Sequence, residues 1–359
     1  YDLSVKSVTG IFNLTGSTGN DTLIGNAAAQ TLNGGDGDDV LDGGDGDDIL
    51  IGGNGIDTIL GGAGNDAIHV SDFAPGEVID GGSGVNTLTT TGSVFLALST
   101  IENIQNLITA NGGVALTAEQ CPQFLSIRTA STSQQAGTDI SYTLIVAQSA
   151  GVYDFRGKID QDNFWLFANI PGCTLIGSDT KQRFSGSAAD DVFYGYGGDD
   201  IFDGGGGNNT IHGGDGNDRF EPVTGALNKL YGESGDDSFF LVSATTGSVV
   251  DGGSGQNTLF TLNSIVGITI RSIQTLVTNT IMLTADQFAQ LAVSAVWQPY
   301  NPQNTIGVIA FTAGTYDLRG ISHTARFAVL NGSAGHDTLI GDADRQTIYG
   351  SHGDDVIDG

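Results

Sequence analysis

Residues 34–69 read GGDGDDVLD, GGDGDDILI, GGNGIDTIL and GGAGNDAIH, which are four nine-residue units in one register. Two looser units precede them without a gap, GSTGNDTLI from Gly16 and GNAAAQTLN from Gly25. All six units begin with glycine and carry an aliphatic residue at the eighth position, and all but the second carry aspartate at the sixth. A tandem period of this length is the signature of a repeat architecture, in which each unit adds one turn and one short strand.

The residue types in these units predict calcium turns. Glycine at positions one, two and four lets the backbone turn sharply, so that several carbonyl groups can face one centre. Aspartate at position six adds a hard carboxylate oxygen, and Ca²⁺ takes six to eight oxygen ligands in a flexible geometry. After each turn, a short strand places one aliphatic side chain inward. The predicted inward residues are Leu23, Leu32, Leu41, Leu50, Ile59 and Ile68.

The pattern G-G-x-G-x-D-x-U-x resembles the RTX (repeats-in-toxin) nonapeptide of secreted Gram-negative bacterial proteins. The resemblance implies an all-β fold, an elongated parallel β-roll or β-solenoid in which two turns and two strands form one coil. It also implies several Ca²⁺ ions, each held between stacked turns by carboxylates and glycine-loop carbonyls. Carried onto this chain, it stacks Asp39 on Asp57 along one side and Asp48 on Asp66 along the other. A disordered Gly/Asp-rich linker is the alternative, and the recurring inward aliphatic residue argues against it.

The candidate metal ligands are the position-six aspartates of all the nonapeptide blocks and the turn glycines of the first. They are Asp21, Asp39, Asp48, Asp57, Asp66, Asp191, Asp200, Asp218, Asp237, Asp337, Asp355, Gly35, Gly37, Gly44, Gly46, Gly53, Gly55, Gly62 and Gly64.

Charge and composition agree with this interpretation. The chain has 41 acidic against 12 basic residues, a formal net charge of −29, and 39% hydrophobic residues. Such an acidic chain repels nucleic acid and anionic membrane surfaces, so we expect neither as a partner. No apolar run approaches the length of a membrane span, and we expect no membrane insertion.

A longer internal repeat contains the nonapeptides. Related text begins at Tyr1, Tyr153 and Tyr316 and leads each time into a nonapeptide block. The predicted organisation is a first block with a leading strand, a β-rich insert, a second and partly degenerate block, a second β-rich insert, and the start of a third block. The corresponding residues are 1–88, 89–171, 172–259, 260–331 and 332–359. Because Tyr1 is not an initiator and Gly359 interrupts an array, we expect the chain to be part of a longer protein.

Several units lack the position-six aspartate. Glutamine replaces it in the second unit of each block, at Gln30, Gln182 and Gln346, which predicts turns that do not bind calcium as the others do. Asparagine replaces it at Asn86 and Asn257, at the ends of the first two blocks. These asparagines predict closing turns of each array.

The inserts are predicted to be extra β coils, each with one short helix. Leu116–Gln120 and Leu283–Gln287 both place threonine three residues before glutamine, which is a capping box. Asp154 and Arg156 lie two residues apart, on one strand face, as do Asp317 and Arg319. A structural ion pair is the favoured interpretation of each couple, with an active-site pair as the alternative.

The sequence offers no sign of catalysis. It lacks an HExxH motif, a phosphate-binding loop ending in Lys-Ser/Thr and a Gly-x-Ser-x-Gly elbow. Trp165 and Trp297 are expected in the core, with sugar stacking as the alternative. Cys121 and Cys173 are expected to be buried or free thiols rather than a disulfide.

We therefore expect a non-enzymatic, calcium-dependent folding and structural module of a large secreted RTX protein. The resemblance places such a protein outside the cell or on its surface, as an adhesin, a surface-layer (S-layer) protein or a biofilm-matrix component. Ca²⁺ would drive folding after type I secretion. The alternative is a carbohydrate-binding or secretion and folding module attached to an extracellular enzyme or toxin. Calcium is the expected partner, with copies of the same chain or cell-surface polysaccharide as further candidates.

Overall fold

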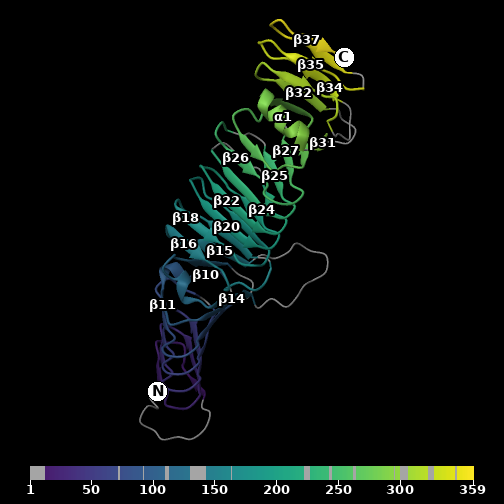
Figure 1. The fold of residues 1–359 in the computed structure, drawn as a ribbon. Coiled ribbons are helices and arrows are strands. Elements are labelled where there is room, and N and C mark those ends of the chain that lie inside the picture. The colour runs from purple at the N-terminus through teal and green to yellow at the C-terminus, as the bar shows by residue number, and fades with distance from the viewer. Residues whose placement is uncertain are drawn as a thin grey trace. The chain divides into compact units, whose positions relative to one another are not determined.

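The computed structural model shows a parallel β-solenoid built from short strands joined by tight turns (Figure 1). All pairings between the described strands are parallel, as a coil-on-coil solenoid requires. The structure describes residues 13–71, 73–91, 93–109, 113–129, 143–162, 164–221, 227–241, 245–261, 264–294, 296–299, 306–321, 327–343 and 346–359. The chain divides into two compact units, one ending at Gln182 and one running over Arg183–Gly359.

The first unit begins with two parallel sheets formed by alternate strands of the first block. One sheet contains β1 (Asn13–Thr15), β3 (Thr31–Asp36), β5 (Ile49–Asn54), β7 (Ala67–Val70), β9 (Thr87–Thr90), β12 (Asn106–Thr109) and β14 (Ser126–Thr129), in that order. The facing sheet contains β2 (Thr22–Ile24), β4 (Val40–Asp42), β6 (Thr58–Leu60), β8 (Val78–Asp80) and β11 (Thr100–Glu102). Because β12, β14 and β11 come from the first insert, that insert continues the ladders of the block.

The rest of the first unit consists of two further ladders and two short 3-10 helices. One ladder contains β10 (Val94–Phe95), β13 (Val114–Leu116), β15 (Thr143–Ala147) and β17 (Phe164–Ala168). The other pairs β16 (Gly151–Asp154) with β18 (Cys173–Ile176). The 3-10 helices are η1 (Leu96–Leu98) and η2 (Cys121–Gln123).

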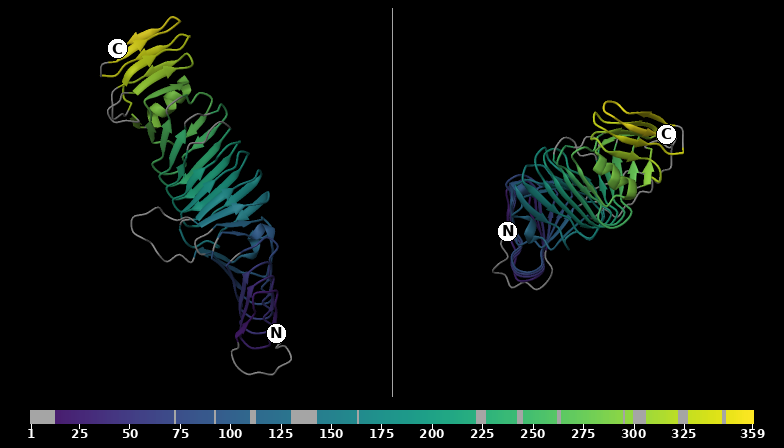
Figure 2. Two further views of the ribbon diagram at one scale, coloured as in Figure 1. Left: turned by 180° about the vertical axis from the view of Figure 1, so that it is seen from behind. Right: turned by 45° about the horizontal axis from the view of Figure 1, so that its top comes forward.

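The second unit repeats this plan with four ladders. The first ladder contains β19 (Gln182–Ser185), β21 (Ile201–Asp203), β23 (Arg219–Phe220), β25 (Ser238–Leu241), β27 (Thr258–Thr261), β29 (Thr275–Val277) and β31 (Val296–Gln298). The second, which faces it, contains β20 (Val192–Gly197), β22 (Thr210–Asp215), β24 (Lys229–Ser234), β26 (Val249–Asp251) and β28 (Thr269–Arg271). The last two are β30 (Thr280–Leu283), β32 (Ile306–Ala310), β34 (Phe327–Asn331) and β36 (Thr347–Tyr349), and β33 (Thr315–Asp317), β35 (Thr338–Ile340) and β37 (Val356–Asp358). Figure 2 shows these strands lying one above another from coil to coil.

The position-eight side chains form the core of the first block. Leu41 pairs in register with Ile59, and Leu50 pairs with Ile68. All six predicted inward residues are fully buried, which confirms the predicted nine-residue alternation. Because a β-strand sends successive residues to opposite faces, the residue at position eight points inward while its neighbours on the strand point outward.

Phenylalanine fills the same inward position in the second block. Phe184, Phe202, Phe220 and Phe239 are fully buried, and consecutive rings stack with centroids 4.5–5.3 Å apart. Trp297 is also fully buried, against Phe288 and Phe327, so its predicted place in the core is confirmed.

The two predicted capping boxes lead to different helices. Thr284 and Gln287 exchange side-chain and backbone hydrogen bonds, and the α-helix α1 (Ala285–Ser294) follows. Thr117 and Gln120 make the same exchange, but the chain there forms a turn and then η2, with Pro122 in its first turn. Proline fits the first turn of a helix. The first insert therefore carries a short 3-10 helix where the second carries an α-helix.

Candidate calcium-binding turns

The position-six side chains form a column along each side of the first block. On one side, the backbone N–H of Asp21 donates to Oδ1 of Asp39 at 2.8 Å, and the N–H of Asp39 donates to Oδ1 of Asp57 at 2.9 Å. Each partner lies 18 residues further along, one coil away. Asp21, Asp39 and Asp57 thus lie in one column, as the sequence predicts.

The opposite side of the block carries a second column. The N–H of Gln30 donates to Asp48 Oδ1 at 2.7 Å, that of Asp48 to Asp66 Oδ1 at 2.9 Å, and that of Asp66 to Asn86 Oδ1 at 2.8 Å. Asn86 in turn donates its N–H to Gln105 Oε1 at 2.6 Å. One carboxylate oxygen of Asp39, Asp48, Asp57 and Asp66 is therefore used to join neighbouring coils.

The other carboxylate oxygen is left without a donor in the best-formed turns. The side chains of Asp39, Asp48, Asp57, Asp66, Asp218 and Asp237 are only 1–2% exposed. In all six, Oδ2 is buried and accepts no hydrogen bond. A buried ionised carboxylate is strongly disfavoured unless a cation or hydrogen bonds compensate it, so these oxygens fit a bound metal ion.

Backbone carbonyls converge on the same space as these oxygens. A Cβ atom added to Gly43 would lie 2.5 Å from Asp48 Oδ2 and 2.6 Å from the carbonyl oxygen of Gly61. At Gly61, the corresponding distances to Asp66 Oδ2 and to Gly81 O are both 2.5 Å. Only glycine leaves room at position one. The resulting set of carboxylate and carbonyl oxygens is the hard donor set that Ca²⁺ prefers.

The predicted turn glycines adopt the backbone conformation that such turns need. All eight candidate glycines of the first block have φ between +92° and +148°, a region that residues with a side chain rarely occupy. They are Gly35, Gly37, Gly44, Gly46, Gly53, Gly55, Gly62 and Gly64.

Burial raises the pKa of the carboxylates in these turns. It brings the pKa of Asp48 from its ordinary 3.8 to about 7, with the nearby charge of Asp66 adding to the effect. Burial likewise raises the pKa of Asp218 to about 7 and that of Asp237 to about 6. The pKa of Asp21 is instead lowered, because the backbone N–H of Ser17 donates to its carboxylate. Burial thus disfavours the ionised form of these carboxylates in the metal-free turns.

The second block has aspartate at position six along one of its two columns. The N–H of Asp200 donates to Asp218 Oδ1 at 2.9 Å, that of Asp218 to Asp237 Oδ1 at 2.8 Å, and that of Asp237 to Asn257 Oδ1 at 2.8 Å. The opposite column is different, because Asp191 donates to Asn209 and Asn209 donates to Asn228. The sequence counts Asp191 with the ligands, and in the structure its N–H donates to the Asn209 amide while its carboxylate accepts from Ser187.

In the third block, the N–H of Asp337 donates to Asp355 Oδ1 at 2.9 Å, so these two candidate ligands also lie in one column.

A further buried acid extends the first column, and the sequence analysis missed it. Strand β8 pairs with β6 so that Val78 lies beside Thr58, which places Glu77 one coil beyond Asp57. The Glu77 side chain is fully buried. Its unit has a longer turn, so a strict nine-residue frame does not reveal it.

Position five carries a second hydrogen-bond ladder that sequence reasoning also missed. Asp38 Oδ1 accepts from the N–H of Ile56 at 2.9 Å, and Asp47 Oδ1 accepts from the N–H of Asn65 at 2.7 Å. In this ladder the acceptor lies one coil before the donor, opposite to position six. Backbone N–H groups one coil further along also donate to the side chains of Asn20, Asn65, Asp190, Asp199, Asn208, Asn217, Asp236 and His336. The signal is a polar acceptor recurring at position five.

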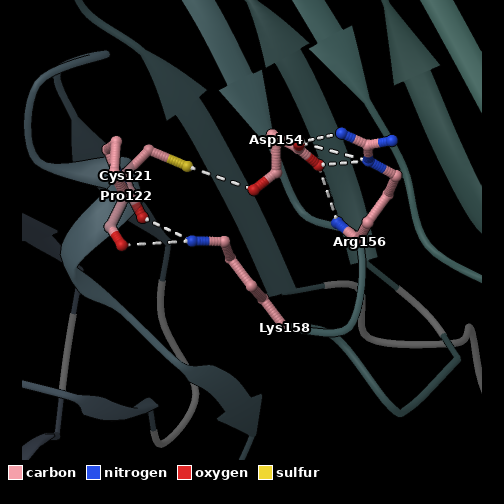
Figure 3. Close-up of polar contacts among 5 residues, drawn as sticks. All are labelled: Cys121, Pro122, Asp154, Arg156 and Lys158. Carbon is pink, nitrogen blue, oxygen red and sulfur yellow. Dashed lines mark hydrogen bonds and ion pairs between the residues drawn. The ribbon is translucent and has the colours of Figure 1, made fainter.

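The Asp-x-Arg couples of the inserts are ion pairs, as the sequence predicts. Figure 3 shows the Arg156 guanidinium against the Asp154 carboxylate, at 2.5 Å, and Arg319 lies 3.0 Å from Asp317 in the second unit. Strand β16 ends at Asp154, so Arg156 lies in the following turn rather than on the strand face. Both pairs are largely exposed and tie a turn to a strand end.

A lysine side chain binds the backbone carbonyl groups of one turn in the first insert. Lys158 Nζ donates to the carbonyl oxygens of Cys121 at 3.1 Å and Pro122 at 3.4 Å (Figure 3). It also donates to the carbonyl oxygen of Phe124 at 2.9 Å. Cys121 and Cys173 are buried and form no disulfide, as predicted. Burial raises the pKa of the Cys121 thiol to about 11, so it is not a reactive thiolate.

Within the described ranges, no three His, Cys, Asp or Glu side chains gather into a metal cluster. This agrees with turns in which carbonyl oxygens supply most of the ligands. Among the same residues, no helix has both the length and the apolar character needed to cross a membrane.

Comparison with known families identifies the repeats. The model of the RTX calcium-binding nonapeptide repeat matches residues 15–50, 42–72, 176–211, 201–221 and 330–359, which fall in all three nonapeptide blocks. No curated protein matches the chain. Five of the six carboxylates whose Oδ2 has no donor lie within the matched ranges: those of Asp39, Asp48, Asp57, Asp66 and Asp218. These matches identify RTX calcium-binding nonapeptide repeats in all three blocks of a parallel β-solenoid, and repeats of this kind bind several Ca²⁺ ions.

Proposed function

We propose that this chain is a non-enzymatic module whose folding is driven by calcium, within a large secreted bacterial protein of the cell surface. One observation carries the proposal: six carboxylates are buried with an oxygen that accepts no hydrogen bond. Without a cation, these charges oppose folding, and the net charge of −29 adds self-repulsion. With Ca²⁺ bound, the same carboxylates hold neighbouring coils together.

Mass action gives the size of the effect. Extracellular calcium modules bind with dissociation constants of about 10⁻⁴ to 10⁻³ M. At roughly tenfold excess of calcium, each site stabilises the folded chain by about 1.4 kcal/mol. A few such sites amount to a large part of a domain's stability, which is on the order of 5–15 kcal/mol. Millimolar calcium outside a cell therefore suffices to fold the chain, and a calcium-poor cytoplasm leaves it unfolded.

This dependence suits export. An unfolded chain passes through a type I secretion channel and folds on reaching calcium outside. Reiterated solenoid units suit a structural protein such as an adhesin, a surface layer or a biofilm matrix, whose partners are further copies or surface polysaccharide.

A far-UV circular dichroism titration tests the proposal. The chelated chain should be largely unfolded, and millimolar Ca²⁺ should produce a β-rich spectrum and a cooperative melt. Mg²⁺ at the same concentration is the control. It should act weakly, because it requires tighter octahedral geometry than these turns offer. An unchanged spectrum and melting temperature after chelation would reject calcium-driven folding.

A further inference from the structure

Among the described residues, the nonapeptide turns with aspartate or glutamine at position six adopt two conformations. In an open turn, the residue at position two has positive φ and the position-six carboxylate points into the turn. In a capped turn, the position-two N–H donates to the position-six side chain. Ser17 and Asp21 form a capped turn, in which Ser17 N lies 2.5 Å and Ser17 Oγ 3.0 Å from Asp21 Oδ2. The oxygen that an open turn leaves without a donor is satisfied here by serine.

The same serine cap recurs in the other two blocks. Ser187 donates its N–H at 2.8 Å and its hydroxyl at 3.0 Å to Asp191 Oδ2. Ser333 donates its N–H at 2.6 Å and its hydroxyl at 2.8 Å to Asp337 Oδ2. Each of these serines stands at position two of its unit, where the tandem units of the first block carry glycine.

The glutamine turns are capped in the same way. Gln30 Oε1 accepts from the N–H of Asn26 at 2.9 Å, Gln182 Oε1 from that of Ser178 at 3.0 Å, and Gln346 Oε1 from that of Asp342 at 3.0 Å. Since the serine and glutamine turns alternate sides, each block opens with one capped turn in each of its two columns.

Backbone conformation separates the two classes. Position two has positive φ in the open turns, including those where it is not glycine: Tyr196 at +79°, Glu233 at +73° and Ser351 at +73°. Residues with a side chain rarely adopt a positive φ, so the surrounding turn must hold these three residues in this conformation. Ser17, Ser187 and Ser333 are not in this region. The identity of the residue alone therefore does not decide the class.

Asparagine closes turns by a third arrangement. Asn209 Nδ2 donates to the carbonyl oxygens of Gly204 at 2.8 Å and Gly206 at 2.9 Å, within its own turn. Asn86 Nδ2 donates to Asn103 O, and Asn257 Nδ2 donates to Ser272 O, each at 3.1 Å. In these turns an amide N–H faces the oxygens that a cation would otherwise bind.

We propose that calcium binds only the open turns, and that the serine, glutamine and asparagine turns bind no metal. The inference rests on the proposed function and refines it, because it removes Asp21, Asp191 and Asp337 from the set of calcium ligands. The open turns are those of Asp39, Asp48, Asp57, Asp66, Asp200, Asp218, Asp237 and Asp355. In the second block, calcium is thereby confined to one side of the solenoid.

The physical reason is competition between donors and a cation. An N–H or O–H group that points at a carboxylate oxygen satisfies it and also places positive partial charge where the ion would lie. A first coil satisfied in this way needs no ion. It can fold before calcium binds and offer a template on which the next coil stacks, which lowers the cost of starting a solenoid.

Two variants from one column test the assignment. Asp21→Asn and Asp39→Asn remove one carboxylate each, 18 residues apart, from a capped and an open turn. Calcium bound per full-length chain is measured by equilibrium dialysis in saturating calcium, with circular dichroism to monitor folding. The proposal expects the wild-type count for Asp21→Asn and a loss of at least one ion for Asp39→Asn. Asp191→Asn and Asp218→Asn form a second matched pair, should Asp39→Asn fail to fold.

Equal losses within both pairs would overturn the inference and leave the proposed function standing. A wild-type chain that binds no calcium would overturn both. A crystal grown in calcium gives an independent readout through anomalous scattering. The expected map has calcium peaks beside Asp39 and Asp48 and none beside Asp21 or Asn209. A peak at Asp21 would contradict the assignment.

Discussion

The backbone N–H of Asp48 donates to Oδ1 of Asp66, one coil away, at 2.9 Å, while Asp48 Oδ2 is buried without a donor. Each carboxylate in the column thus divides its two oxygens between two tasks. One oxygen fixes the register of adjacent coils, and the other is the proposed calcium ligand. On this proposal, folding and calcium binding are coupled because the same side chain performs both.

Substitutions at Asp48 and at Gln30, its neighbour in the column, should differ in their effect on calcium affinity, because only Asp48 is a proposed calcium ligand. Asp48→Ala removes the open oxygen and leaves the N–H of Gln30 without its acceptor, a loss of about 1–3 kcal/mol. We expect calcium affinity to fall by on the order of tenfold or more. Gln30→Ala is the matched control, and it should change calcium affinity little because Gln30 offers no carboxylate. Isothermal titration measures both, and equal losses would show that the carboxylate at position six does not hold the metal.

The raised pKa values predict how stability and affinity depend on pH. The pKa values of Asp48 and Asp218, raised by burial to about 7 in the fold, start from 3.8 in the unfolded chain. The folded chain therefore binds more protons between these values. Without metal, its stability should be greatest below about pH 4 and should fall as pH rises through about 7. Far-UV circular dichroism of the chelated chain at several pH values measures this trend, which should appear as residual β structure that increases toward low pH.

Calcium reverses the trend, because the ion binds the deprotonated carboxylate and displaces its proton. The calcium concentration at half-folding should decrease from pH 5 to about pH 7.5 and then level off. A midpoint independent of pH would mean that the buried carboxylates are not the ligands.

The close contact at Gly43 predicts a severe effect of a single methyl group. In Gly43→Ala, the new Cβ would lie 2.5 Å from Asp48 Oδ2 and 2.6 Å from a backbone oxygen, so the turn must shift. We expect a loss of several kcal/mol and weaker calcium binding, as for other overpacked sites. Gly19→Ala is the control, since no atom lies within 4 Å of its added Cβ. Thermal melts in calcium should rank Gly43→Ala far below Gly19→Ala, and similar melting temperatures would contradict the geometry.

The position-five ladder predicts that the side chain at this position must accept a hydrogen bond but need not be charged. Asp38→Asn keeps an oxygen for the N–H of Ile56, whereas Asp38→Ala removes it. The alanine variant should lose about 0.5–1.5 kcal/mol in calcium, and the asparagine variant should stay close to wild type. If both variants lose equally, the charge of Asp38, not its hydrogen bond, is what matters.

The nine-residue period predicted the inward residues and the stacking of Asp39 on Asp57 and of Asp48 on Asp66, and the Asp-x-Arg spacing predicted the ion pairs of the inserts. These features repeat at a fixed phase, so one sequence displays them directly. The cap at Ser17, the acid at Glu77 and the amide bridge of Asn209 were not predicted. Each depends on where an N–H group or a longer turn lies in space, which the repeat pattern does not encode. The 3-10 helix after Thr117 was missed because the capping box specifies only how a helix begins.

Amide hydrogen exchange in the first block tests calcium-driven folding most directly. Peptides covering residues 34–69 should exchange their strand amides within seconds in chelator and be strongly protected in millimolar calcium, because the proposal requires calcium in the open turns for β3 to β7 to form. Equal protection of these peptides with and without calcium would contradict the account.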